Sequence, residues 1–210
     1  MADLKQLYNA ILNGDHKIAA AVTKQALSEG IAPTELITEY MSPAMDEVGR
    51  RFECEEYFVP ELLLSGRAMK AALELLQPLL AASGAEPAAR VVIGTVKGDL
   101  HDIGKNLVSS MLEGAGFEVH DLGADVAPEK FVAAVQECKP DLVCLSALLT
   151  VTMPAMRDVV DALKAAGLRD QVRVLVGGAP VTSEFANEIG ADAYAENAGV
   201  AVTVARRLTA

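Results

Sequence analysis

The alternation of short apolar runs with helical patterns after residue 85 constrains the fold more than any other feature of the sequence. Strands and helices that alternate at this spacing form βαβ units, and hence a parallel sheet with helices on both faces. Five such units fit a flavodoxin-like (Rossmann-like) order, with the switch point between the first and third strands. The expected strands are 90–96, 118–122, 141–146, 172–176 and 191–194, and the expected helices are 104–113, 128–138, 154–166, 183–188 and 198–208.

The first part of the chain has a different period. Apolar residues recur there at steps of three and four, which predicts helices over 3–13, 17–28, 34–51 and 60–80. Four helices joined by short loops predict an antiparallel four-helix bundle. The small residues, Gly and Pro of 81–87 indicate a linker, so we expect a helical domain over 1–84 and an α/β domain over 85–210.

Charge and composition exclude several classes of protein. A formal net charge of −11 argues against nucleic acid or an anionic membrane as a partner, since both require a cationic surface. No run approaches the roughly 20 apolar residues of a membrane span, and the start of the sequence does not resemble a signal peptide. The three cysteines, Cys54, Cys138 and Cys144, lack the spacing of a disulfide framework or a zinc site. We therefore expect a cytoplasmic protein with reduced thiols.

Small and polar residues follow four of the expected strands, in the segments 97–104, 146–152, 177–180 and 196–198. The carboxyl ends of parallel strands meet at one edge of a sheet, and ligands of open α/β sheets bind in the crevice there. The sequence therefore predicts a binding site built from four loops.

His101 is the only histidine in these loops. An imidazole can give one nitrogen to a metal while the other donates its proton to a carboxylate, and Asp99 is close enough in sequence to be that partner. Taken alone, the short pattern favours an ordinary surface loop, because such patterns recur by chance. One histidine is too few ligands for zinc, so a metal held here must bring its own equatorial ligands, as a macrocycle does.

Glycine gives a second indication. Gly177 and Gly178 end a buried strand, where glycine marks either a tight turn or the close approach of another group. With Ser146 and Leu148 at the end of the neighbouring strand, they could instead open a slot for a long, flat group.

These residues together resemble a known signature. Asp99-x-His101-x-x-Gly104, Ser146-x-Leu148 and Gly177-Gly178, in this order and spacing, are similar to the cobalamin-binding blocks of corrinoid proteins. The string 96–106 resembles the binding loop of cobalamin-dependent methionine synthase and of small corrinoid proteins of methyltransferase systems, and 48–52 with 57–62 resembles the helical cap of those proteins. The resemblance covers nearly the whole chain.

The resemblance implies a role for each matching residue. His101 would be the lower axial ligand of cobalt in cobalamin or a related cobamide, Asp99 would accept its other proton, and Thr152 would complete the relay where methionine synthase has serine. Such a chain can couple the protonation of His101 to the state of the metal. Residues expected to contact the cofactor are Gly94, Asp99, Leu100, His101, Asp102, Ile103, Gly104, Ser146, Leu148, Thr150, Gly177, Gly178, Tyr194, Asn197 and Ala198, with Phe52 and Val59 in the cap over the upper face. Val59 stands where methionine synthase has leucine, a departure from the pattern of that protein.

The implied function is that of a methyl carrier, a cofactor-carrying subunit rather than a complete catalyst. The expected partners are a substrate-specific methyltransferase, an acceptor methyltransferase that uses a folate or a thiol, and a reductive activator. Two alternatives share the signature: a cobalamin-binding sensor or regulator, and the small subunit of a cobalamin-dependent mutase. The mutase needs a large barrel for which 210 residues leave no room, and the regulator adds a DNA-binding domain and a bundle Trp that this chain lacks.

Overall fold

The computed structural model describes residues 2–83 and 89–210, with the side chains of 81–83 left out. It divides into two compact units, Met1–Pro87 with Ser110–Gly116, and Ala88–Ser109 with Phe117–Ala210. The predicted linker over 81–87 and the boundary between residues 84 and 85 fall mainly on residues outside the described ones. Among the described helices, none combines the length and the apolar composition that crossing a membrane requires.

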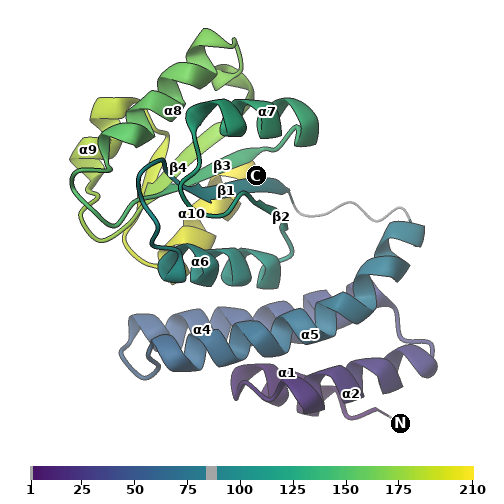
Figure 1. Ribbon diagram of the computed structural model, residues 1–210. Helices are drawn as coiled ribbons and strands as arrows, with labels where there is room; N and C mark the ends of the chain where they lie inside the picture. Colours follow the sequence, from purple (N-terminus) through teal and green to yellow (C-terminus); the bar gives the residue numbers. More distant parts are fainter. Residues whose placement is uncertain (1, 84–88) are drawn as a thin grey trace. The chain divides into compact units, whose positions relative to one another are not determined.

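The helical unit begins with α1 (Leu4–Leu12) and α2 (His16–Ser28) and ends with the long α5 (Val59–Ser83) (Figure 1). The side chains of Asp3 and Asp15 accept hydrogen bonds from the first backbone N–H groups of α1 and α2, which fixes where both helices begin. The core of these helices is formed by one face of each; its largest fully buried side chains within residues 2–80 are Leu7, Ile11, Leu36, Met41, Leu62, Met69 and Leu76.

The helix expected over 34–51 is interrupted. The structure has α3 (Pro33–Leu36), a π-helical turn (Ile37–Met41) and α4 (Ser42–Glu53) without a break between them. The Ser42 N–H bonds to the carbonyl of Ile37, five residues back, and Pro43 follows with no N–H to donate. The prediction of one uninterrupted α-helix is therefore wrong at this turn.

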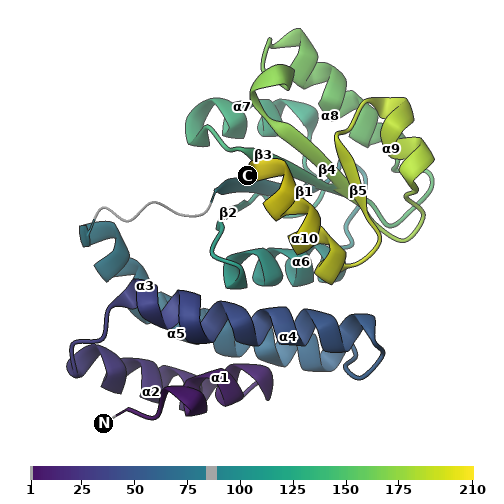
Figure 2. The same cartoon turned by 180° about the vertical axis from the view of Figure 1, so that it is seen from behind.

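The α/β unit contains a five-stranded parallel sheet in the order β2-β1-β3-β4-β5, which confirms the predicted α/β class. Helices α7 and α8 cover one face, and α6 and α10 cover the other, as the two opposite views show (Figures 1 and 2). The strands are β1 (Arg90–Thr95), β2 (Glu118–Asp121), β3 (Leu142–Ser146), β4 (Arg173–Gly177) and β5 (Ala193–Ala195), and the helices are α6 (Ile103–Gly114), α7 (Pro128–Cys138), α8 (Pro154–Ala165), a 3-10 turn (Arg169–Gln171), α9 (Ser183–Ile189) and α10 (Ala198–Thr209).

Register places alternate strand residues in the core of each face. Val92, Val143 and Val174 are paired across β1, β3 and β4, and all three are fully buried in the same apolar cluster with Phe131 of α7. Both faces of the central strands are covered, so their sequences are continuously apolar rather than alternating. The same register places Ser146 beside Thr95 and Gly177, at the edge where the strands end.

Gly178 offers a test of how closely this edge is packed. It has φ +134, and a Cβ added there would lie 1.9 Å from the carbonyl oxygen of Ala147. Gly178→Ala should therefore lower the free energy of unfolding by at least about 2 kcal/mol, since it combines backbone strain with a clash against main chain. Denaturant unfolding of the protein without cofactor measures the change.

The control is Gly104→Ala. A Cβ at Gly104 would meet nothing within 4 Å, and alanine is the better helix former by roughly 0.5–1 kcal/mol. This variant should be as stable as the wild type or more so. Equal stability of the two alanine variants would contradict the packing described here.

Candidate functional site: a histidine held by a buried carboxylate

The site forms at the carboxyl edge of the sheet, in the loops that follow β1 and β3. The first loop, 96–102, carries Asp99 and His101, and the second, 147–153, carries Thr152. The structure thus brings together three residues that are separated by up to 53 positions in sequence.

Asp99 is the buried centre of this arrangement, with no solvent exposure. Its Oδ1 accepts hydrogen bonds from the backbone N–H of His101 at 3.0 Å and faces His101 Nδ1 at 2.8 Å. Its Oδ2 accepts from the backbone N–H groups of Leu148 at 2.7 Å and Leu149 at 3.3 Å, and from the Thr152 hydroxyl at 2.7 Å. The carboxylate therefore binds the two loops to each other.

The hydrogen bonds also determine the charge of Asp99. Burial by itself raises the pKa of this carboxyl group, but the bonds from the His101 N–H, the Thr152 hydroxyl and the Leu148 N–H together lower the pKa below its ordinary value of 3.8. Asp99 is ionised at neutral pH. An ionised carboxylate can only accept, so the proton between the two side chains lies on Nδ1 of His101.

His101 is oriented by this contact and by its own backbone. The buried Thr95 hydroxyl donates to the His101 carbonyl oxygen at 3.0 Å. The imidazole side chain is 51% exposed, and among the described residues none hydrogen-bonds its Nε2. The geometry leaves one nitrogen with a lone pair facing outward, which is what a metal ligand requires.

The surroundings fit a metal that arrives with its own ligands. Within the described part of the chain there is no group of three or more His, Cys, Asp or Glu residues that could hold a free ion. Exposed apolar side chains lie in the same two loops and at the start of α6, which would suit a large organic ring; they are Leu100 (76%), Ile103 (68%), Leu148 (43%), Leu149 (40%) and Val151 (81%). The residues present therefore fit a corrinoid held by a single imidazole.

The other predicted contacts lie at different distances from this centre. Ser146 and Gly177 are neighbours in register, and Gly178 packs against Ala147. Asp102 and Thr150 are exposed in the two loops, and Gly104 is exposed in the first turn of α6. At the far edge of the sheet are Tyr194 in β5 and Ala198 at the start of α10, with Asn197 between them as the cap of that helix. Their contacts with a cofactor stay predictions.

Gly94 has a visible packing role. A Cβ on this residue would lie 2.7 Å from Cζ of Phe131, so glycine at this position makes room for the aromatic ring of α7. Its predicted contact with the cofactor is untested.

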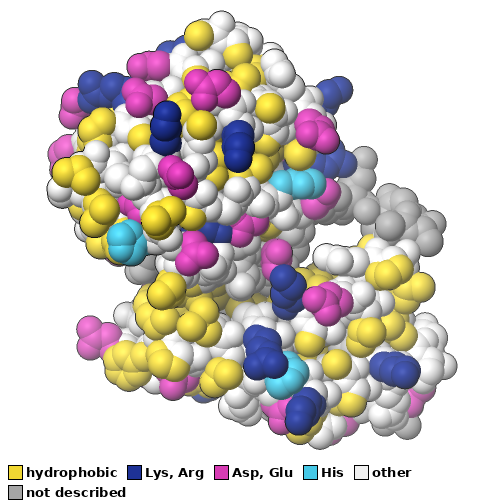
Figure 3. Space-filling view, in the orientation of Figure 1, with side chains coloured by type: hydrophobic (Ala, Val, Ile, Leu, Met, Phe, Trp, Pro, Cys, Tyr) yellow, Lys and Arg dark blue, Asp and Glu magenta, His cyan; other side chains and the backbone are white. Residues whose placement is uncertain are grey.

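Phe52 and Val59 belong to the helical unit. Phe52 is half-buried near the end of α4, and Val59 begins α5 with 42% of its surface exposed. The space-filling view shows apolar side chains exposed on this unit (Figure 3); Phe58, Leu63 and Leu64 are among those beside Val59 in the sequence. Such a surface is available to cover an apolar group.

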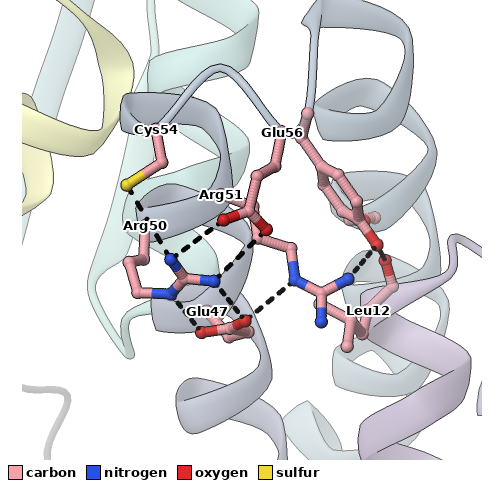
Figure 4. Close-up of polar contacts among 8 residues, drawn as sticks. Leu12, Glu47, Arg50, Arg51, Cys54 and Glu56 are labelled. Carbon is pink, nitrogen blue, oxygen red and sulfur yellow. Dashed lines mark hydrogen bonds and ion pairs between the residues drawn. The ribbon is translucent and has the colours of Figure 1, made fainter.

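A network of charged residues holds the segment between α4 and α5 (Figure 4). Glu47 accepts from Arg50 Nε at 2.7 Å and from Arg51 Nε at 2.8 Å, and Arg50 also pairs with Glu56 at 3.3 Å. Arg51 donates to the Tyr57 hydroxyl at 3.0 Å, and that hydroxyl donates to the carbonyl of Leu12 in α1 at 3.2 Å. The segment that leads to the exposed Phe58 is thus tied to two helices.

Three residues around the site were not anticipated from the sequence as contributors. Thr95 supports the His101 carbonyl, Lys105 is a buried lysine in the first turn of α6, and Asp125 hydrogen-bonds the loop of His101. Thr95 and Asp125 carry no local pattern, while Lys105 lies inside the string 96–106, where its burial could not be inferred.

The fold and the site define a class of protein: an α/β domain that exposes one carboxylate-supported imidazole at the carboxyl edge of its sheet. Comparison with known proteins agrees. Two family models, both described as a B12 binding domain, match residues 89–203 and 3–77. The chain belongs to the family of B12-binding corrinoid proteins.

Three similar proteins illustrate the relationship. The chain is 43% identical over 208 residues to dimethylamine corrinoid protein 1 of Methanosarcina acetivorans, covering 99% of this chain and 97% of that one. It is 46% identical over 196 residues to trimethylamine corrinoid protein 2 of Methanosarcina mazei, covering 92% and 90%. Among solved structures, the methanol:cobalamin methyltransferase complex MtaBC of Methanosarcina barkeri matches with a TM-score of 0.86 and 31% identity, over 98% of this chain and 79% of that chain.

The Thr152 hydroxyl can be tested without the cofactor. Thr152→Val keeps the shape of the side chain but removes a donor to a buried carboxylate, so the free energy of unfolding should fall by about 1–3 kcal/mol. Thr152→Ser restores the hydroxyl and should recover most of the loss. Denaturant unfolding measures both; a valine variant as stable as the wild type would show that this bond contributes nothing.

The Glu47 network predicts a dependence on pH. Hydrogen bonds from Arg50 and then Arg51 lower the pKa of Glu47 from 4.5 to about 2. Because the pKa is lower in the folded state, the contribution of Glu47 to stability is complete above pH 4.5 and is lost as the pH falls from 4.5 through 2. Glu47→Gln should lower the Tm at pH 7 and flatten its decline below pH 4.5.

The matched control for this series is Glu53→Gln, which removes a carboxylate of the same helix that takes no part in the network. If the two glutamine variants follow the same pH profile, the network does not stabilise the folded state.

Proposed function

We propose that this chain carries a methyl group between two methyltransferases on a corrinoid held by His101. The observation that supports the proposal is the hydrogen-bond chain from His101 through Asp99 to Thr152, which presents one free nitrogen at the carboxyl edge of the sheet. A bound corrinoid supplies a cobalt centre on which a methyl group can be placed and from which it can be removed.

In this proposal, the residues of the chain hold the corrinoid and orient the imidazole that binds it. His101 would offer Nε2 to the metal of the corrinoid, and Asp99 keeps the imidazole proton at Nδ1, so that the tautomer needed for coordination is already fixed. The Leu148 and Leu149 N–H groups and the Thr152 hydroxyl hold Asp99 in place. The exposed apolar side chains of Leu100, Ile103 and Val151 would exclude water around the ligand once the ring covers them.

We further propose that the donor methyltransferase acts on a methylated amine and forms a complex with this chain. Sequence identity supports a methylated amine as the methyl donor. The chain is 43% and 46% identical to the dimethylamine and trimethylamine corrinoid proteins, but 31% identical to the matched chain of the methanol complex. That complex also supports a direct partnership between a corrinoid protein and a methyltransferase. The acceptor methyltransferase and the reductive activator remain parts of this proposal.

A location in the cytoplasm is part of the same proposal. It is supported by the three cysteines, Cys54, Cys138 and Cys144, which are all free thiols in the structure.

The central test is the ligand. Wild-type protein incubated with hydroxocobalamin should take up the cofactor and show the absorption spectrum of histidine-bound cobalt. His101→Ala should lose that spectrum, because no other described side chain of the two loops offers an imidazole. His120→Ala, which changes a histidine on β2, is the control and should keep it. An unchanged spectrum in His101→Ala would refute the proposed ligand.

The donor is tested by methyl transfer. Reduced, cofactor-loaded protein should accept a methyl group when mixed with a dimethylamine methyltransferase and dimethylamine, and not with a methanol methyltransferase and methanol. The change in the cobalt absorption spectrum measures the transfer. Transfer from methanol alone would contradict the assignment of the donor.

A further inference from the structure

The loop that follows β2 is hydrogen-bonded to the loop that carries His101. The Asp125 carboxylate accepts from the Gly98 N–H at 2.7 Å, and the Asp125 N–H donates to the Asp99 carbonyl oxygen at 2.9 Å. The two bonds therefore hold Gly98 and Asp99, which lie shortly before His101 in the sequence. Asp125 makes both because its backbone has φ +55, a conformation that is uncommon for a residue with a side chain.

An ion pair between a buried lysine and an exposed carboxylate connects the end of β2 to the first turn of α6, on the other side of His101 in the sequence. Lys105, in the first turn of α6, is only 3% exposed, and its ammonium group pairs with Asp121 at the end of β2. It also lies 2.6 Å from Oδ1 of Asn106. The other oxygen of Asp121 accepts from the Gly123 N–H at 2.8 Å, so the ion pair is continuous with the loop that holds Asp125.

These contacts are locally unfavourable. A buried lysine pays a desolvation penalty, and a positive charge in the first turn of a helix opposes the helix dipole. A non-glycine residue at positive φ adds backbone strain. All three unfavourable features lie within a few residues of the loop that carries His101. An apolar contact in place of the ion pair and a glycine in place of Asp125 would stabilise the fold as well. The arrangement is explained if it fixes the geometry of that loop.

We propose that Lys105, Asp121 and Asp125 form a clasp whose role is to hold the His101 loop in its metal-binding shape before the corrinoid arrives. The inference rests on the proposed function. The three are positioning residues: Asp125 holds the loop before His101, and the Lys105–Asp121 pair holds the first turn of α6, which follows that loop. None of the bonds described for them involves the imidazole of His101 or the carboxylate of Asp99. Without the clasp the loop samples other shapes, and the imidazole is less often where the metal needs it.

The first test compares two substitutions of Asp125. Asp125→Gly removes the acceptor but accepts φ +55 without strain, whereas Asp125→Asn keeps an oxygen for the Gly98 N–H and tolerates the same φ. Asp125→Gly should bind hydroxocobalamin about tenfold more weakly, the loss typical when the support of a metal ligand is removed, and a smaller share of the bound cofactor should be histidine-ligated. Asp125→Asn should bind like the wild type.

The second test removes the ion pair. Lys105→Met with Asp121→Asn replaces both charges by neutral groups of similar size and leaves no buried charge unpaired. This double variant should show the same two effects, weaker binding and a smaller histidine-ligated share. Unfolding of the protein without cofactor is measured in parallel, and Asp125→Gly keeps the proposal testable if the double variant does not fold.

The matched control is Asp141→Ala. Asp141 accepts a hydrogen bond from the Arg90 N–H at 2.8 Å, a bond of the same kind at the opposite edge of the sheet. It should lower the Tm and leave both the affinity and the spectrum unchanged. If it weakens cobalamin binding as much as Asp125→Gly does, the effect is general destabilisation and the clasp is refuted.

The outcomes separate the two proposals. Wild-type affinity and a wild-type spectrum in Asp125→Gly and in the double variant would overturn the clasp and leave the proposed function intact. A wild-type protein that takes up no hydroxocobalamin, or one whose spectrum survives His101→Ala, would overturn the proposed function and the clasp with it.

Discussion

The buried carboxylate of Asp99 is the interaction on which the site depends. It accepts five hydrogen bonds, three of them from backbone N–H groups of two separate loops. A buried anion with fewer partners would be costly, so the loops after β1 and β3 are stable in this arrangement only together. The position of the His101 ring is consequently set by the sheet and not by its own loop alone.

The topology explains why the site lies where it does. Strand β1 is an interior strand with β2 on one side and β3 on the other, so the chain leaves β1 at the point where the order reverses. The loop after β1 can therefore be supported from both sides: Asp99 binds the loop after β3, and Asp125 binds it from the loop after β2. An edge strand would offer support on one side only.

Sequence reasoning predicted the parts of this protein that have a regular period. Strand β1 was expected over 90–96 and is observed over Arg90–Thr95, and the strand expected over 191–194 is β5 at Ala193–Ala195. The pairing of Asp99 with His101 could be expected because the two residues are only two positions apart, which brings the carboxylate within reach of the imidazole. The bonds from Leu148 and Leu149 to Asp99 span about fifty positions and involve only backbone, which no residue pattern encodes. The role of Asp125 could not be predicted for a similar reason. In the sequence, an acidic residue in a loop has the same pattern whether or not its carboxylate accepts a hydrogen bond from the backbone.

The π turn between α3 and α4 has a geometric consequence for the helical unit. Leu36 and Met41 are both fully buried, although five residues of a regular α-helix would turn the second side chain about 140° away from the first. The wider turn absorbs this excess rotation, so the apolar stripe continues without a break into Met45 and Val48. It thereby sets the angular phase of the whole of α4, and this phase is what turns Arg50 outward, toward Glu56 in the segment that leads into α5. One wide turn near residue 40 thus governs the orientation of side chains three turns further along the chain.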